Sequence, residues 1–174
     1  MTIKPGTIFF RNYDQDLLEK QFVLDQVKNL EDLFNNRLER SRLARANHLS
    51  EINIPYGERC QQTLDVFFHP KRVNNGVVQI FIHGGFWHSL DAKVFSFISN
   101  GFCPDGTVTI VIDYPLFPEE NFLGIIESCK KAIKWVYENG GELAIDRKRI
   151  YLSGSSAGGH LVTLLMNRSW PKEY

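Results

Sequence analysis

The most informative stretch of the sequence is YLSGSSAGGHL, residues 151–161. It holds one Gly-x-Ser-x-Gly pattern, from Gly154 to Gly158, with Ser156 at its centre. In this pattern the serine stands on a sharp strand-to-helix turn, because the glycines remove side chains that would collide in the tight backbone. The apolar run RIYLSG precedes the turn, and GHLVTLLMN continues as an apolar helix. We therefore predict Ser156 as a nucleophile, with the amide of Ala157 at the helix start as an oxyanion donor.

A second glycine pair lies in FIHGGFW, at the end of an earlier apolar run. These adjacent glycines, Gly84 and Gly85, let the backbone turn its N–H groups toward a reacting carbonyl group. Taken alone, the segment is equally well explained as a glycine turn after a buried strand. Because the serine turn follows it in the order expected for a hydrolase, we interpret it as the second half of an oxyanion hole.

Three apolar runs predict a central sheet: Val77 to His83, Thr107 to Tyr114 and Arg149 to Gly154. They are rich in β-branched residues and nearly continuous, as in parallel strands that are covered on both faces. The shorter run TLDVFF is predicted to be a further β segment. Between the last two runs, apolar residues at helical spacing predict a helix that ends at the segment NGG. The fold class is therefore α/β, with a mostly parallel sheet and flanking helices.

Apolar residues also recur at helical spacing before the sheet, at Val23, Val27, Leu30, Phe34 and Leu38. This spacing predicts one amphipathic helix from about residue 14 to residue 46. The stretch INIPYGERCQQ then interrupts the pattern with a proline and a glycine. We expect residues 1–50 to form an N-terminal helical arm and residues 51–174 to form the N-terminal part of the α/β domain, in a single domain overall.

The composition excludes several classes of protein. The 174 residues include 20 basic and 20 acidic side chains, so there is no electrostatic case for binding nucleic acid or an anionic membrane. No segment approaches the roughly 18 unbroken apolar residues of a membrane span. The cysteines are odd in number and widely spaced, and no secretion signal is evident, so we expect a cytoplasmic protein. No metal spacing and no phosphate-loop ending are present, so no metal or other cofactor is expected.

Several stretches, in a consistent order, resemble one family. They are LEDLFNNR with SRLAR, IPYGERCQQTLDVFFHP, IFIHGGFWHSLDAKVFSF, VIDYPLFPE and RIYLSGSSAGGHL, and they cover most of the chain from about residue 30. The chain resembles an α/β-hydrolase, and more closely the kynurenine formamidase (arylformamidase) branch, which is similar to hormone-sensitive-lipase-type esterases. The resemblance implies the nucleophile Ser156, the oxyanion donors Gly84, Gly85 and Ala157, and the aromatic pocket walls Phe86 and Trp87.

The resemblance also implies an activity. It is the hydrolysis of N-formyl-L-kynurenine to kynurenine and formate in tryptophan catabolism, with a small-molecule formamide or ester as the substrate. The residue before the nucleophile, often histidine in such formamidases, is Ser155 here, which changes the edge of the implied pocket. A small-ester carboxylesterase is the alternative enzyme. A non-catalytic hydrolase that acts as a binding module is the alternative from another class.

The other members of a catalytic triad are not evident. In α/β-hydrolases the order is Ser, then Asp or Glu, then His, whereas only His160 and Glu173 follow Ser156. His160 stands one turn along the same helix, so its ring cannot face the serine from a separate loop, and we expect a structural role. We predict that residues 1–174 are the N-terminal part of a hydrolase, truncated after the nucleophile elbow helix, and inactive alone.

Other polar residues receive structural roles. His83 and His88 flank the glycine pair, and we predict that both are hydrogen-bonded structural residues. Asp113 is expected to brace a loop, and Asp91 to support a helix start.

If the chain is complete, the strand that ends at Gly154 would form a sheet edge with unpaired backbone groups. We then expect a homo-oligomer through this edge, or a partner that completes the sheet.

Overall fold

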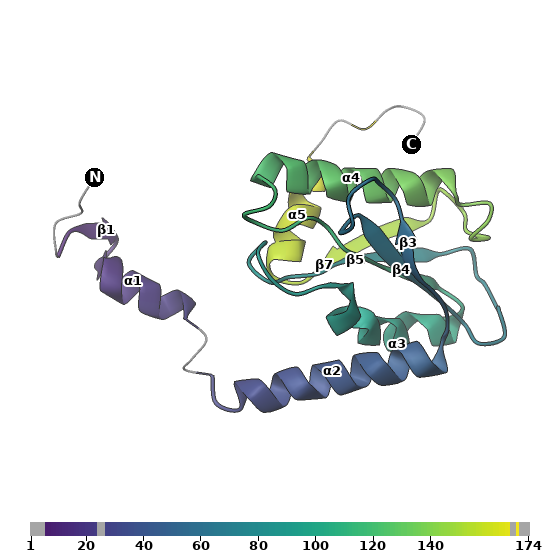
Figure 1. Ribbon diagram of the computed structural model, residues 1–174, viewed down its shortest axis with the longest axis horizontal. Helices are drawn as coiled ribbons and strands as arrows, with labels where there is room; N and C mark the ends of the chain where they lie inside the picture. Colours follow the sequence, from purple (N-terminus) through teal and green to yellow (C-terminus); the bar gives the residue numbers. More distant parts are fainter. Residues whose placement is uncertain (1–5, 24–26, 168–169, 171–174) are drawn as a thin grey trace. The chain divides into compact units, whose positions relative to one another are not determined.

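The computed structural model of the protein describes residues 6–23, 27–167 and 170 (Figure 1). The chain forms two compact units, residues 1–36 and residues 37–174. Within the described residues, each helix is too short or too polar to span a lipid bilayer.

The first unit contains a short hairpin and a helix. Strand β1 (Ile8–Phe10) pairs antiparallel with β2 (Tyr13–Asp14), and α1 (Gln15–Phe22) follows directly. The Asp14 side chain caps α1 by accepting a hydrogen bond from the Leu17 N–H at 2.9 Å. Because α1 buries none of its residues, its local stability depends on such caps and not on a core.

The single helix predicted from residue 14 to residue 46 is wrong, because the structure divides it. α1 ends before Val23, whose backbone is extended (φ −78°, ψ 128°). The second helix, α2 (Leu30–Asn47), begins after Asn29, which has a left-handed φ of 62°. Residues 24–26 lie outside the described residues. Apolar spacing did not reveal the break, since side-chain periodicity carries no information about these backbone angles. The boundary between the two units lies within α2, after residue 36, so the last part of this helix belongs to the second unit.

The second unit is built on a five-stranded sheet in the order β3-β4-β6-β5-β7. The strands are β3 (Leu49–Pro55), β4 (Thr63–Phe68), β5 (Val78–Ile82), β6 (Val108–Ile112) and β7 (Ile150–Gly154). β5 pairs in parallel with β6 and β7, whereas β4 is antiparallel to β3 and β6. The parallel arrangement predicted from the three apolar runs is confirmed, and β7 lies at the edge of the sheet, where Tyr151 is 55% exposed.

The other edge strand, β3, is absent from the sequence prediction. Its residues alternate between exposed and half-buried, and the half-buried Ile52 and Ile54 pack against the η2-side and α4-side cores, respectively. The pairing with β4 shifts register between Glu51 and Ile54, where Asn53 has a φ of 58°. Pro55 ends the strand at the edge, where a missing N–H disturbs no ladder. A half-exposed, bulged strand that ends in proline lacks the continuous apolar run that revealed the other strands.

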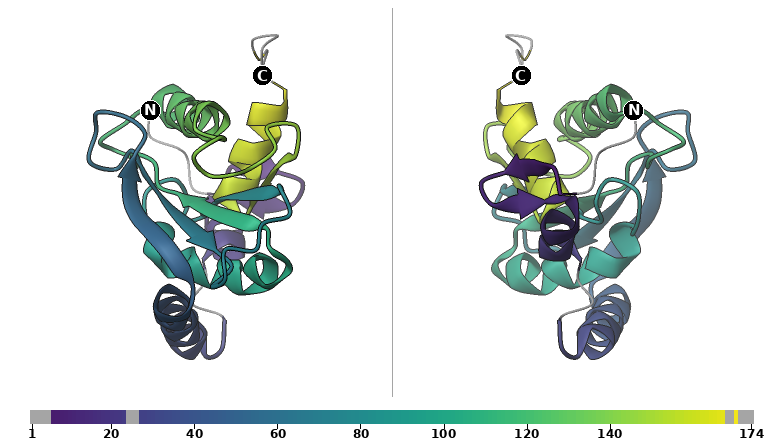
Figure 2. Two further views of the ribbon diagram at one scale, coloured as in Figure 1. Left: turned by 90° about the vertical axis from the view of Figure 1, so that its right-hand side faces the viewer. Right: turned by 90° about the vertical axis from the view of Figure 1, so that its left-hand side faces the viewer.

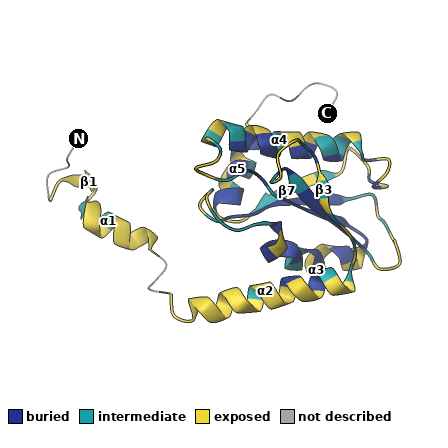
Figure 3. Cartoon of the chain, viewed as in Figure 1, coloured by how far each residue is buried: buried dark blue, intermediate teal, exposed yellow. Residues whose placement is uncertain are grey.

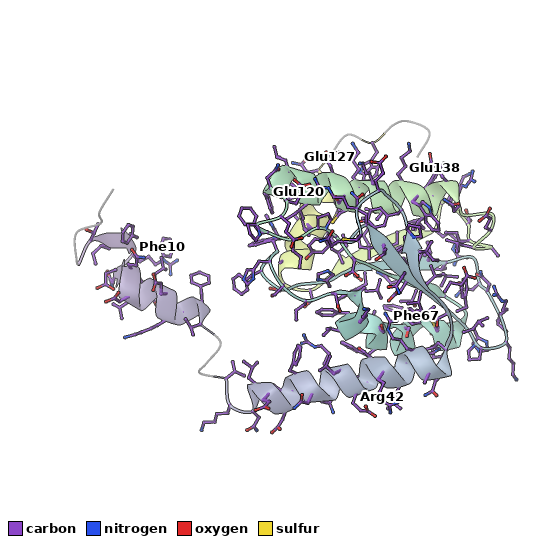
Figure 4. All side chains as sticks on the ribbon, viewed as in Figure 1. Phe10, Arg42, Phe67, Glu120, Glu127 and Glu138 are labelled. Carbon is purple, nitrogen blue, oxygen red and sulfur yellow. The ribbon has the colours of Figure 1, made fainter. Side chains whose placement is uncertain are left out.

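Helices cover both faces of the sheet, as the two side views show (Figure 2). α4 (Phe122–Glu138) and α5 (Ala157–Met166) pack on one face, and η2 (Ala92–Ile98) with α3 (Ser99–Phe102) lies on the other. The buried residues are concentrated in the sheet and on the inner sides of these helices (Figure 3). Alternate residues of β4 enter the two cores, so Val66 contributes to the α4 side. Phe67 contributes to the η2 side, where Figure 4 labels it.

A partly buried ion pair joins the last part of α2 to the sheet. The guanidinium of Arg45 binds the Asp65 carboxylate, which also accepts a hydrogen bond from the Asn53 N–H at 2.8 Å. Burial raises the pKa of Asp65, whereas the hydrogen bond from Asn53 and the charge of Arg45 oppose that rise. On the same helix, Ser41 Oγ donates to the Val94 carbonyl at 2.8 Å. The last part of α2 is therefore anchored to the layer on the η2 side.

Adjacent residues of α5 provide a matched test of the packing on the α4 side. Leu165 is fully buried, whereas Met166 is 77% exposed. We expect Leu165→Ala to lower the free energy of unfolding by about 2–5 kcal/mol, because it leaves a cavity. Met166→Ala should change it by less than about 0.5 kcal/mol. Urea unfolding followed by circular dichroism measures both, and equal effects would contradict the assigned burial.

Candidate functional site

The site predicted from the sequence is centred on the turn between β7 and α5. β7 ends at Gly154, and α5 begins at Ala157. Ser156 lies in the connection with φ 53° and ψ −118°, a conformation that is strained for any residue other than glycine. Ser155 and Ser156 are both exposed. The predicted strand, sharp turn and helix are therefore present, with the serine at the strained position.

The glycines of this turn are required by close backbone contacts. A Cβ atom on Gly158 would overlap the carbonyl oxygen of Ile82, at the end of the neighbouring strand β5. A Cβ atom on Gly154 would overlap the backbone of Gly158. The first turn of α5 thus rests directly on the ends of β7 and β5. This close packing explains why the two glycines flank Ser156 at that spacing.

The predicted oxyanion loop lies against the serine turn. β5 and β7 are parallel neighbours, with Ile82 opposite Gly154. The segments that follow them therefore leave the sheet side by side, at the carboxyl ends of the two strands. A Cβ atom on Gly84 would lie 3.2 Å from Ser156 Cβ and 2.7 Å from the Ser155 carbonyl oxygen. The structure therefore brings Gly84 and Ser156 together, as the sequence analysis expected.

The loop after Gly84 has an unusual backbone. Gly85 has a φ of 119°, and its carbonyl oxygen accepts hydrogen bonds from the N–H groups of His88 at 3.1 Å and Ser89 at 3.0 Å. Phe86 and Trp87 follow with left-handed φ values of 53° and 62°. Non-glycine residues in that region mark stored strain. The residue types at these two positions did not predict it, since aromatic residues do not favour a positive φ.

His83 orients the start of this loop. Its ring is buried, stacks on Tyr114 at 4.3 Å, and places Nδ1 2.7 Å from the Gly84 carbonyl oxygen. A carbonyl oxygen only accepts, so Nδ1 is the protonated nitrogen. Nε2 lies 3.4 Å from Asp113 Oδ1, without the geometry of a hydrogen bond. Because a peptide C=O and the next N–H point in opposite directions, fixing the Gly84 carbonyl also fixes the Gly85 amide.

Tyr114 and the two aspartates complete this support. The Tyr114 hydroxyl donates to the His83 carbonyl at 2.8 Å, and burial raises the pKa of Tyr114, so the hydroxyl keeps its proton. Asp113 Oδ1 accepts a hydrogen bond from the Ala92 N–H at 2.6 Å. Asp91 caps η2 by accepting from the Val94 N–H. The structural roles predicted for Asp91, Asp113 and His83 are confirmed. His88, by contrast, is exposed at the surface, and its ring lies 6.3 Å from that of Phe86.

The predicted aromatic walls differ from each other. Phe86 is 47% exposed, whereas Trp87 is half-buried between two other rings. The Trp87 ring lies 5.7 Å from Phe122 and 5.5 Å from His160, and the latter two rings stack at 5.6 Å. We call Trp87, Phe122 and His160 the ring cluster. The sequence patterns did not reveal Phe122 as a neighbour of the site, because the cluster joins three segments that are distant along the chain.

His160, the one histidine that follows Ser156 in the sequence, packs against aromatic rings. His160, on α5, directs its ring to Trp87 and Phe122. Among residues 6–23, 27–167 and 170, His, Cys, Asp and Glu side chains form no group that could hold a metal ion. Cys60, Cys103 and Cys129 are free thiols. An apolar groove lies at the β7 edge, lined partly by Ile150, Leu152 and Met166, and Ser156 does not line it.

Two glycines, one with atoms close to the place of an added Cβ and one without, test the contact between the glycine loop and the serine turn. Gly84→Ala should lower the free energy of unfolding by about 1–3 kcal/mol, because its Cβ would be forced against Ser155 and Ser156. Gly101, on α3, has no atom within 4 Å of the added Cβ. Gly101→Ala should therefore be neutral or stabilise by up to about 1 kcal/mol. Denaturant unfolding of the two variants measures the difference, and a harmless Gly84→Ala would contradict the close approach.

Comparison with known proteins agrees with this geometry. Residues 64–169 match the family described as BD-FAE. A kynurenine formamidase of Salmo salar is 24% identical over 168 residues, which are 92% of this chain and 56% of that protein. An arylesterase of Saccharolobus solfataricus is 41% identical over 93 residues, which are 53% of this chain and 30% of that protein.

Solved structures share the fold. Esterase B of Lactobacillus rhamnosis superposes with a TM-score of 0.63 at 24% identity, covering 78% of this chain and 46% of that one. An esterase of Thermogutta terrifontis gives a TM-score of 0.56 at 28% identity, covering 64% and 42%. The predicted α/β-hydrolase fold is confirmed. The chain spans about half the length, or less, of the relatives that it matches.

Proposed function

Because the chain belongs to the BD-FAE family, we propose that it is part of a serine hydrolase in which Ser156 is the nucleophile. The observation that carries the proposal is the strained backbone of Ser156, with φ 53° and ψ −118°, between β7 and α5. On such a turn the side chain projects away from both elements and can reach a bound carbonyl carbon. The exposure of Ser156 supports the same role.

The backbone amides of Gly84, Gly85 and Ala157 are the proposed oxyanion donors. The approach of Gly84 to Ser156 supports this assignment, as does the place of Ala157 in the first turn of α5. When Ser156 Oγ attacks a carbonyl carbon, negative charge develops on the carbonyl oxygen. Donors held in position by the fold stabilise that charge without reorienting, and the N-terminus of α5 adds a partial positive charge.

The proposed substrate is an arylformamide, N-formyl-L-kynurenine, with tryptophan catabolism in the cytoplasm as the setting. Relatives named kynurenine formamidase, among them the protein of Salmo salar, support it. Ser156 Oγ would add to the formyl carbon, and the C–N bond would break as the arylamine leaves with a proton. Water would then attack the formyl ester of Ser156, releasing formate and restoring the hydroxyl. The exposed Phe86 ring and the neighbouring Ser155 would form the edge of the pocket.

The acid and the base are proposed to lie C-terminal to the described residues. In this fold they follow the nucleophile in the order Asp or Glu, then His. His160 does not fit the role of base, because its ring is engaged by Trp87 and Phe122. Without a base, the hydroxyl of Ser156 remains a weak nucleophile, so residues 1–174 alone are proposed to be inactive.

A small-ester carboxylesterase is the second candidate. The arylesterase of Saccharolobus solfataricus favours it, because its 41% identity over 93 residues exceeds the 24% of the Salmo salar formamidase. The turn at Ser156 and the glycine loop serve an ester and a formamide equally, since both reactions pass through a tetrahedral oxyanion. The two candidates therefore differ in the leaving group and in the pocket that accepts it.

Labelling with a fluorophosphonate tests the nucleophile. The native polypeptide that carries this chain should be labelled at Ser156, and Ser156→Ala should abolish the labelling. The same substitution should lower hydrolysis by at least about a thousandfold, because the remaining oxyanion hole gives only residual catalysis. Ser155→Ala, one residue away, is the matched control and should still be labelled. A folded native polypeptide that stays unlabelled would favour the non-catalytic binding module.

The substrate is tested by comparing kcat/KM for N-formyl-L-kynurenine with that for short-chain aryl esters. A formamidase should prefer the formamide by at least about tenfold, which corresponds to roughly 1.4 kcal/mol of transition-state stabilisation. A preference of that size for the esters would instead select the carboxylesterase.

A further inference from the structure

The ring cluster links the nucleophile helix to the loop that precedes it in the chain. His160 lies one helical turn beyond Ser156, and its N–H donates to the Ser156 carbonyl at 3.1 Å. Its ring is nearly parallel to Phe122, at 15°, and steeply inclined to Trp87, at 76°. Trp87 and Phe122 are themselves perpendicular, at 89°. Each ring thus contacts the other two, and the cluster joins α5, the start of α4 and the glycine loop.

We propose that His160 is a positioning residue, which holds the oxyanion loop against Ser156 through the ring of Trp87. This inference rests on the proposed function, because it assigns a purpose to the loop only if Ser156 is a nucleophile. It adds a residue that acts by its shape and not by proton transfer.

The backbone of the loop requires such support. Phe86 and Trp87 occupy the left-handed region in succession, with φ values of 53° and 62°. Strained residues persist only where their surroundings hold them. The Trp87 carbonyl accepts one hydrogen bond, from the Phe117 N–H at 2.8 Å. The Trp87 indole nitrogen is buried and has no acceptor within the described residues. The Trp87 side chain is therefore held by packing alone, against the core on the α4 side, the Phe86 ring and the two other rings of the cluster, one of which is that of His160.

The geometry makes the nucleophile and the oxyanion donors sensitive to His160. Ser156 directly precedes α5 and His160 lies in its first turn, whereas Trp87 and Gly84 share the loop after β5. Offset and edge-to-face ring contacts resist sliding of one element past the other, because they hold only near their preferred separations. Loss of the His160 ring would free the loop to move relative to Ser156. The amides of Gly84 and Gly85 would then be misplaced with respect to the developing oxyanion.

The test compares two substitutions of His160 in the native polypeptide. We expect His160→Ala to lower both the rate of fluorophosphonate labelling of Ser156 and kcat by about tenfold, with KM within about twofold. His160→Phe keeps a flat ring and should stay within about threefold of wild type in both rates. Thr163→Ala is the control, since Thr163 is exposed on the same helix and should leave both rates unchanged. Circular dichroism at the assay temperature confirms that each variant is folded.

Phe122→Leu provides a second variant that does not touch His160. It should also slow labelling, and adding it to His160→Ala should cost less than the product of the two single effects, because either change opens the cluster. If His160→Ala does not fold, slow labelling of folded Phe122→Leu together with near wild-type labelling of His160→Phe supports the inference.

Several results would overturn the inference. One is an unchanged labelling rate in His160→Ala, and another is an effect of that substitution on KM alone. A third is a labelling rate of His160→Phe as slow as that of His160→Ala, which would mean that the chemistry of the imidazole matters. In these cases wild-type labelling at Ser156 persists, and the proposed function stands. A folded wild-type protein that is not labelled would overturn both the proposed function and the inference.

Discussion

The close packing of α5 on the end of β5 is the constraint on which the site depends. Gly158 stands where any Cβ would overlap the Ile82 carbonyl, so the first turn of α5 lies directly against the sheet. This approach fixes the start of the helix, and Ser156 directly precedes it with a φ of 53° and a ψ of −118°. It also sets the distance between Ser156 and Gly84, because Gly84 is only two residues beyond Ile82. One backbone contact therefore determines the relation between the two halves of the site.

The remaining interactions around the site keep its backbone in that arrangement. His83 fixes the Gly84 carbonyl, and Tyr114 in turn holds the His83 carbonyl. On the far side of the loop, the rings of Phe122 and His160 hold Trp87. The loop is thus supported from the buried core on one side and from two helices on the other. The strained backbone at Phe86 and Trp87 is tolerated because Gly84 before it and the Trp87 ring itself are held in place.

The sequence predicted the parts of this structure that follow from pattern. Strands β5, β6 and β7 are continuous apolar runs, and the serine turn has its glycines at fixed offsets, so both were predicted with their order and roles. β3 and the break before α2 were not predicted, since this edge strand has no continuous apolar run and the break lies in backbone angles. The ring cluster was not predicted either, because its contacts depend on tertiary structure. The roles of Ser156, Gly84, Gly85 and Ala157 stay predictions that biochemical measurements must test.

The register of β5 with β7 has a consequence for how this site tolerates change. Ile82 is paired with Gly154, and the loop and the serine turn each begin immediately after these paired residues. Side-chain substitutions within the strands leave that alignment intact. A deletion or insertion of one residue in either strand would shift one half of the site by about 3.3 Å along the sheet and turn its side chains to the opposite face. Point substitutions should therefore accumulate in these strands during divergence, while their lengths stay fixed.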